Sequence, residues 1–340
     1  MQNKYYTQHE GKVIKADTKH KLVMAIALDP RTGYRQGLVR CITSREGDIT
    51  VSGYTDRSEL HLIEGSSPYS YEIKGRVEII NEKEVIETIL EDGFDFIGLE
   101  DPEIWIDEKT DMMHLYVTIP LIHEEDFRKN KIYLGHAEGK DLGSLTMTMP
   151  VIKVGSVGME GGAKEPSIAP LNSHNVRLNL VESSEYIGDT YYSIIRVAKA
   201  TDMGKKWEAG DVVFHPSTAN IPWAGGHGSP GPLFPRSFMD MGPGKLLGVM
   251  NGREANTRVG DEVRYNRFSI GLYVYDYENG RIDWISPERF ISDSEARTIT
   301  FASQFVPTGL GRGILYAHVD DSFVRAYELD AEKIRLLLPT

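Results

Sequence analysis

The sequence contains one cysteine, Cys41, in 340 residues. An intramolecular disulfide is therefore excluded, and the polar start MQNKYYTQHEGK lacks the apolar run of a secretory signal. Both features predict a cytoplasmic protein. Cys41 lies in the apolar run LVRCIT, where we expect a buried structural thiol rather than a reactive one.

Long apolar runs and an excess of basic residues are also missing. No stretch approaches the roughly 20 apolar residues that span a bilayer. Lys and Arg number 38 against 50 Asp and Glu, which gives a formal net charge of −12. Nucleic acids and anionic membranes are bound by basic surfaces, so the sequence predicts neither as a partner. The oligomeric state is not fixed by the sequence, and a homo-oligomer stays open.

Helical periodicity is scarce. Only residues 82–93 and 328–338 allow a helical turn or two, whereas short apolar runs that alternate with polar residues are typical of strands. The predicted strands are 13–18, 21–28, 37–44, 48–55, 113–119, 131–137, 176–183, 191–200, 211–216, 245–252, 268–277, 281–286, 313–319 and 323–329. The pattern predicts an all-β fold.

A unit of polar residue, proline, strand, turn and second strand recurs at intervals of roughly 70 residues. It lies around Pro30, Pro102, Pro166, Pro230 and Pro307. Five such units favour a five-bladed β-propeller, in which each small sheet packs on its neighbours. The alternative is a two-sheet sandwich or a pair of β domains. No linker divides the chain, so we expect one domain over residues 1–340.

Carboxylates precede proline in the first three units. They are Asp29, Asp101 and Glu165, with Glu100 beside Asp101. Proline biases the preceding residue toward extended backbone, which could aim these groups into a central channel. Ordinary turn formation at a solvated rim is the alternative. Paired carboxylates in a cleft are what glycosidic bond cleavage requires.

Motifs for other chemistries are absent. The sequence has no GxxxxGK[ST] phosphate loop, no GxSxG elbow, no HExxH and no paired Cys/His spacing. We therefore predict no cofactor and no metal.

Two later segments carry polar candidates. His227 lies in the Gly-rich stretch WAGGHGSPGP and could donate hydrogen bonds to sugar hydroxyls. A loop further on could bind an anion such as phosphate, or it could be a solvated hairpin with local acidic partners. Its arginines are Arg253, Arg258, Arg264 and Arg267.

At these residues the chain resembles the five-bladed propeller glycosidases. It is most similar to glycoside hydrolase family 130, the β-mannoside phosphorylases and mannosidases, and more distantly to family 43. The segments that carry the resemblance are LVRCI at 38–42, GLEDPEI at 98–104, AKEPSIAPL at 163–171, GKLLGVMNG at 244–252 and ILYAHVDDSFVRAYEL at 314–329.

The resemblance implies roles for several of these residues. It makes Asp101 the general acid, acting through a sugar hydroxyl, and Arg40 a substrate-binding residue. Lys164 matches a lysine that helps to bind phosphate in the phosphorylases. Asp320 or Asp321 matches an acidic residue that bonds sugar hydroxyls.

Departures from the family pattern bear on the reaction. Glu103 replaces the Arg of EDPR, Glu182 lies where phosphorylases place a phosphate-binding Arg, and Asn251 replaces the His of YHG in the substrate-binding region. Carboxylates repel phosphate, so these departures favour hydrolysis, with Glu182 or Glu165 as the base. Glu182 could instead point outward from its strand. Family 43 places its acid where Glu165 lies, so the roles of Asp101 and Glu165 could be reversed.

We therefore expect an inverting glycosidase that acts on a short oligosaccharide, a β-mannoside, without a cofactor. One alternative is a phosphate-dependent β-mannoside phosphorylase. Another is a propeller that binds glycans or proteins without catalysis.

Overall fold

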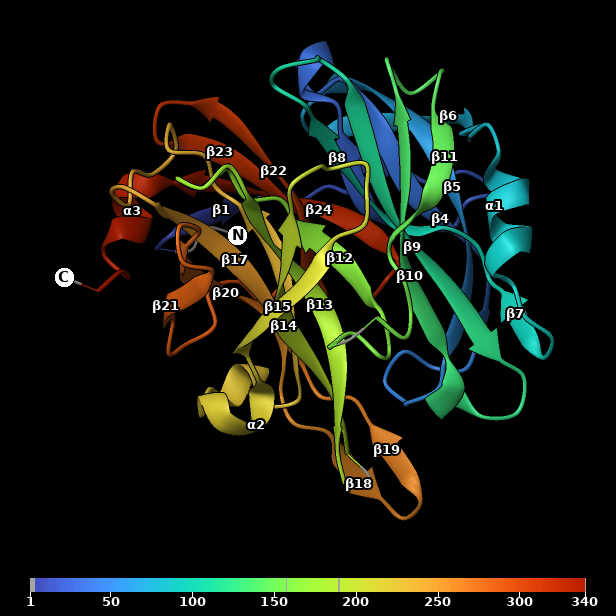
Figure 1. The fold of residues 1–340 in the computed structure, drawn as a ribbon. Helices are drawn as coiled ribbons and strands as arrows, with labels where there is room; N and C mark the ends of the chain where they lie inside the picture. Colours follow the sequence, from blue (N-terminus) through green and yellow to red (C-terminus); the bar gives the residue numbers. More distant parts are fainter. Residues whose placement is uncertain (1–3, 157, 189, 340) are drawn as a thin grey trace.

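The computed structural model describes residues 4–156, 158–188 and 190–339, and most of them lie in β-strands (Figure 1). Successive strands pair antiparallel in five runs, here called units 1 to 5. Unit 1 contains β3 (Leu22–Leu28), β4 (Gln36–Glu46), β5 (Thr55–Ser67) and β6 (Ser70–Arg76). Unit 2 contains β8 (Glu100–Ile106), β9 (Met113–His123), β10 (Lys131–Gly139) and β11 (Thr146–Ile152). Unit 3 contains β12 (Ala163–Ser167), β13 (Arg177–Ile187), β14 (Thr190–Ala200) and β15 (Glu208–Phe214).

The last two units follow the same order. Unit 4 contains β16 (His227–Leu233), β17 (Lys245–Arg253), β20 (Phe268–Asp276) and β21 (Arg281–Ile285). Unit 5 contains β22 (Thr300–Gly309), β23 (Arg312–Val319), β24 (Phe323–Asp330) and the N-terminal β1 (Tyr6–Gln8). A single parallel pair, Ser193 with His227, joins units 3 and 4 into one eight-stranded sheet.

Short elements complete the fold. β2 (Ile14–Lys15) runs parallel to β6, β7 (Phe94–Phe96) pairs with β9, and β18 (Thr257–Val259) forms a protruding hairpin with β19 (Glu262–Arg264) (Figure 1). The α-helices are α1 (Glu82–Ile89), α2 (Pro216–Ala219) and α3 (Ala331–Arg335), and the 3₁₀ turns are η1 (Pro30–Thr32), η2 (Phe127–Lys129) and η3 (Pro222–Ala224). No helix among the described residues is long and apolar enough to cross a membrane.

Both faces of the middle strands are covered, which explains their nearly continuous burial. The five largest apolar clusters in the described part of the chain lie between units 1 and 2, 2 and 3, 3 and 4, 4 and 5, and 5 and 1. Neighbouring residues of one strand serve different clusters: Leu180 faces unit 4, and Val181 faces unit 2. This follows from the alternation of side chains across a strand.

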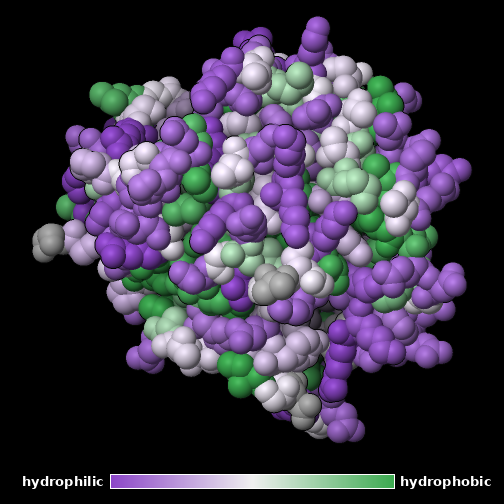
Figure 2. All heavy atoms as spheres, in the orientation of Figure 1, coloured by the Kyte–Doolittle hydropathy of each residue, from purple (hydrophilic) through white to green (hydrophobic). Residues whose placement is uncertain are grey.

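The outer surface carries the polar residues. The face in Figure 2 is mainly hydrophilic, with apolar side chains only in small scattered groups. The apolar residues of the strands are therefore used mainly between units.

The all-β prediction is confirmed, with one wrong strand. Residues 48–54 form turns because the Asp48 carboxylate accepts hydrogen bonds from the amide and hydroxyl of Thr50. The charge-rich strand β5 that follows was not predicted. Helices α1 and α3 lie within the two segments expected to be helical. Cys41 is fully buried, as expected.

Candidate active site

A central cavity of about 180 Å³ is bounded by the first strand of every unit. Its lining includes Ala25 of β3, Asp101 of β8, Glu165 of β12, Pro230 of β16 and Ser303 of β22. Each of these strands carries an irregularity in its pairing with the next strand, at or beside the lining residue. A larger open groove of about 630 Å³ lies beside α2 and β21 and contains none of the predicted site residues.

Asp101 and Glu165 occupy equivalent places in these irregular strands. Their φ angles are 46° and 50°, and Ala25 has the same conformation at 48°. A left-handed conformation in a residue other than glycine costs on the order of 1–3 kcal/mol and clusters at functional sites. The two carboxylates therefore belong to one repeated position, at which unit 1 carries alanine.

Asp29 does not share this position. It lies after β3, where its carboxylate caps η1 by accepting a hydrogen bond from the Arg31 amide. The Arg31 guanidinium binds both carboxylate oxygens at 3.1 Å. The expectation that Asp29 points into the channel with the other carboxylates is wrong, because its partners are the turn and Arg31.

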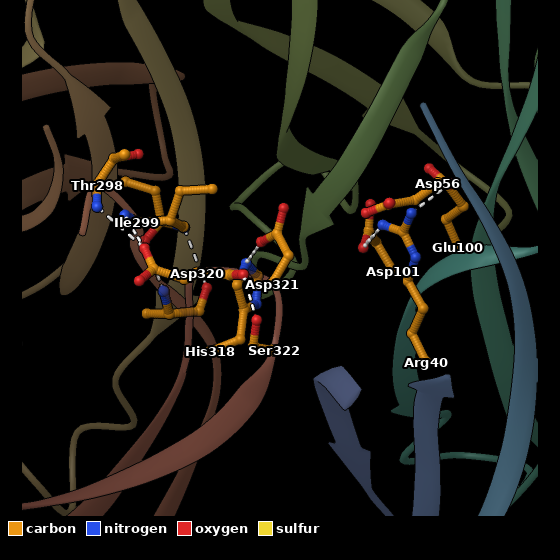
Figure 3. Close-up of polar contacts among 12 residues, drawn as sticks. Arg40, Asp56, Glu100, Asp101, Thr298, Ile299, His318, Asp320, Asp321 and Ser322 are labelled. Atoms are coloured by element: carbon orange, nitrogen blue, oxygen red, sulfur yellow. Dashed lines mark hydrogen bonds and ion pairs between the residues drawn. The ribbon is translucent and has the colours of Figure 1, made fainter. Parts of the chain in front are cut away.

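Arg40 reaches from β4 to the two acidic residues of β8 (Figure 3). Its guanidinium donates to Asp101 at 2.9 Å, to Glu100, and to Ser58 at 2.8 Å. Burial raises the pKa of Glu100 to about 7, more than the Arg40 charge lowers it. Arg40 thus pairs with both carboxyl groups, and Glu100 titrates near neutrality.

Glu165 lies between a cation and a hydroxyl. The ammonium of Lys164 is 3.3 Å from one oxygen, and the Ser229 hydroxyl donates to the other. Burial raises the pKa of Glu165 to about 8, and the charges of Glu182 and Asp101 add to the increase, while Lys164 opposes it. Glu165 therefore holds a proton more strongly than an ordinary glutamate does.

Glu182 is opposite Lys164 in the β12–β13 register and is 3% exposed, so it does not point outward. Its carboxylate is 3.7 Å from the Lys164 ammonium and 3.1 Å from Nε2 of His227. Burial alone would raise the pKa of Glu182, but His227 and Lys164 outweigh it and lower the pKa to about 2. Glu182 is therefore a carboxylate at neutral pH, and it positions Lys164 and His227, whose own pKa is lowered by burial.

The two acidic residues of unit 5 point in different directions (Figure 3). Asp320 accepts hydrogen bonds from the backbone amides of Arg297, Thr298 and Ile299, so its carboxylate is fully used by a loop. Asp321 lies nearer Arg40. Burial would raise the pKa of Asp321, but His318, 3.1 Å away, and to a smaller extent Arg40 lower it to about 2. Of the pair, only Asp321 remains a candidate for sugar binding.

Asn251 is fully buried and holds two units together. Its amide nitrogen donates to the carbonyl of Ala302 at 3.0 Å, and its oxygen accepts from the Ala302 amide at 2.7 Å. The expectation that Asn251 binds substrate is wrong, because both polar groups are used by β22 and none reaches the cavity.

Substitution Asn251→Ala should lower the free energy of unfolding by about 2–5 kcal/mol, because two buried backbone groups of Ala302 lose their partners. Urea denaturation measures the change. Asn266→Ala is the matched control, since Asn266 donates one hydrogen bond at an exposed site. An increase in KM at wild-type stability would restore a binding role to Asn251.

Several residues at the site were not predicted. Tyr54 donates to Asp321 at 3.0 Å, Ser229 donates to Glu165, and Glu103 lines the cavity with its pKa raised to about 8 by burial. Uncharged Ser229 and Tyr54 give no signal in the sequence. Two of the four arginines expected in the loop have different surroundings. Arg264 lies in the β18–β19 hairpin and forms an ion pair with Glu262. Arg253 is buried, and its guanidinium carbon lies 4.0 Å from the centre of the Tyr265 ring.

The arrangement places two carboxyl groups on neighbouring inner strands, Glu165 with a raised pKa and Asp101 in an ion pair. Lys164 lies beside Glu165, Arg40 beside Asp101, and all four groups can form hydrogen bonds with hydroxyl groups.

Solved structures share this fold along nearly the whole chain. A Parabacteroides distasonis protein, provisionally named a glycoside hydrolase, is 15% identical, with 96% of each chain covered and a TM-score of 0.69. A β-1,2-mannobiose phosphorylase from Listeria innocua is 12% identical over 98% of each chain, with a TM-score of 0.64. An endo-arabinase from Bacteroides thetaiotaomicron is 15% identical over 94% of this chain and 97% of its own, with a TM-score of 0.53.

The fold is that of propeller glycosidases. At these identities the likeness establishes the fold, and the resemblance to families 130 and 43 is confirmed at that level. No protein-family model and no curated relative matches the sequence.

Proposed function

We propose that residues 1–340 form a single five-bladed β-propeller that hydrolyses a short oligosaccharide, a β-mannoside, with inversion at the anomeric carbon. Five clusters between units, the last between units 5 and 1, support the five-bladed ring. A cytoplasmic location, expected from the single cysteine, is part of this proposal.

One observation carries the chemistry: Asp101 and Glu165 take the same strained backbone position on adjacent inner strands but have different partners, Arg40 beside Asp101 and Lys164 with Ser229 beside Glu165. Glu165, with its pKa raised to about 8, would protonate the leaving oxygen. Asp101, paired with Arg40, would deprotonate the attacking water. This is the reverse of the assignment implied by family 130 and the one that family 43 implies. Glu182 is then a positioning residue rather than the base.

The size of the cavity supports a short substrate. At about 180 Å³ it is smaller than usual ligand pockets of about 300–1,000 Å³. One sugar would occupy the space beside Asp101 and Glu165. The remaining sugars of the oligosaccharide would extend out of the cavity.

The pH dependence of kcat/KM tests the role of Glu165. An acid must hold its proton, so activity should fall as the pH rises through about 8. If Glu165 were the base, activity would rise through the same range. Glu103 also has a pKa near 8. The fall in kcat/KM near pH 8 must therefore persist in Glu103→Gln if Glu165 is the acid.

A phosphorylase is the second candidate, because the buried Arg253 lies opposite His227 in the β16–β17 register and forms no ion pair with a described carboxylate. Among the described residues, Arg253 forms no ion pair, and its Nε lacks a hydrogen bond. Together with Lys164, it could hold phosphate.

The deciding experiment incubates manno-oligosaccharides with and without phosphate and analyses the products. Free mannose, released first as the α-anomer without phosphate, supports the hydrolase. Phosphate-dependent mannose 1-phosphate would establish the phosphorylase. No product in either condition would favour a propeller that only binds glycans or proteins.

A further inference from the structure

A second group of reactive side chains lies on the other face of β4 from the candidate active site. Arg40 faces unit 2, whereas the next residue, Cys41, faces the cluster between units 1 and 5. The Cys41 thiol meets His61 of β5 and His20, which precedes β3. One ligand atom from each lies within 4.8 Å of the others, and all three residues are buried.

Strand register brings two of these residues together. Cys41 is directly opposite Glu59, and His61 follows two positions later on the same face. Diagonal neighbours of this kind are within reach of long side chains. The His20 and His61 rings are 4.4 Å apart between centroids.

Each histidine has one nitrogen engaged and one free. Nδ1 of His20 lies 3.0 Å from the Asp17 carboxylate, and Nε2 of His61 lies 3.2 Å from Glu59. The other nitrogens, Nε2 of His20 and Nδ1 of His61, are buried and have no hydrogen-bond partner within residues 4–156, 158–188 and 190–339. A buried polar atom without a partner destabilises the folded protein. A bound ligand would give these two nitrogens a partner.

We propose that His20, Cys41 and His61 bind a thiophilic cation, Zn²⁺, at a site separate from the carbohydrate chemistry. A thiolate with two imidazoles suits Zn²⁺ or Cu⁺. The carboxylates behind both imidazoles match the orientation commonly found around zinc-bound histidines. Their two negative charges, with that of the thiolate, favour the divalent ion.

Binding requires the thiolate. Burial raises the pKa of Cys41 to about 12, so the residue is a thiol in the unbound state and releases one proton to solvent as the metal–sulfur bond forms. Water would complete four-coordination. Asp17 is exposed and bonds the His20 nitrogen that does not face the proposed ion.

The other histidine cluster is a weaker candidate. Nδ1 of His114 is hydrogen-bonded to Nε2 of His136 at 2.9 Å, and the remaining His136 nitrogen bonds Thr148. Nδ1 of His114 and both nitrogens of His136 are already hydrogen-bonded, so this pair serves as the internal control.

The test measures metal content and Zn²⁺ affinity of the full chain after chelator treatment, with circular dichroism to confirm folding. We expect one Zn²⁺ per chain, lost in Cys41→Ser and His61→Gln and retained in His114→Gln. Co²⁺ substitution should give a thiolate-to-metal charge-transfer band that Cys41→Ser abolishes. Asp17→Asn changes only an exposed residue, so it should fold normally and weaken binding about 10- to 100-fold.

Three results would overturn the proposal. They are no metal uptake by the wild type, equal binding by Cys41→Ser, or loss of binding in His114→Gln instead. Uptake of Cu⁺ without Zn²⁺ at the same three residues would support the site and overturn the zinc assignment.

Discussion

Replacing Glu165 by Gln should lower kcat on an unactivated oligosaccharide by about 10²–10⁴-fold, the usual contribution of a general acid. The amide keeps the hydrogen bond from Ser229 but has no proton to give to the leaving oxygen. Aryl glycosides with acidic leaving groups need little protonation, so they should lose much less activity. Steady-state kinetics on both substrate types measure the difference.

Glu103→Gln is the matched control, because Glu103 lines the same cavity with a similarly raised pKa. It should stay within a few-fold of the wild type. Equal losses on activated and unactivated substrates in Glu165→Gln would show that Glu165 is not the acid.

Replacing Arg40 by Met should lower the free energy of unfolding by about 3–5 kcal/mol, because two buried carboxylates lose their cation. Glu100 already has a pKa above its ordinary value, and removal of Arg40 raises it further. A carboxyl group with a raised folded-state pKa stabilises the protein below its ordinary pKa and loses that contribution as the pH rises. The deficit of the variant should therefore shrink as the pH is lowered, as measured by urea denaturation.

Arg57→Met provides the comparison, because Arg57 forms an exposed ion pair with Asp95. Exposed pairs contribute about 0–1 kcal/mol, so this variant should be nearly as stable as the wild type. Equal stabilities for the two variants at neutral pH would mean that the Arg40 network is not a stabilising element.

The sequence predicts the repeat, but the proline of unit 1 is not equivalent in the structure to the prolines of units 2 and 3. Asp101-Pro102 and Glu165-Pro166 lie at the irregularity of an inner strand, whereas the proline of unit 1, Pro30, begins a 3₁₀ turn beyond β3. The equivalent residue there is Ala25, which no proline follows. The feature that these three units share is a left-handed backbone conformation. The sequence indicates this position only in the units where a proline follows it.

For polar residues near the cavity, the sequence does not show which ones bind substrate and which ones stabilise the fold. Asn251 and Asp320 are directed at backbone groups of neighbouring segments far away in sequence. Asp321 and Ser229 reach groups of the site itself. Position along the chain does not distinguish the two kinds of residue, because the packing of the units decides which groups each side chain contacts. The His20, Cys41 and His61 group likewise has no motif spacing, since strand pairing assembles it.

Strand β1 supplies the last strand of unit 5, pairing Tyr6 with Leu329 and Gln8 with Tyr327. Residues 6–8 are synthesised long before their partners, residues 327–329, because ribosomes add only about 5–20 residues per second. Unit 5 therefore cannot complete its strand pairing until β24 has been synthesised. An exposed strand awaiting its partner can pair with another chain, so exchange of this strand between two molecules is the misassembly to which this topology is most exposed.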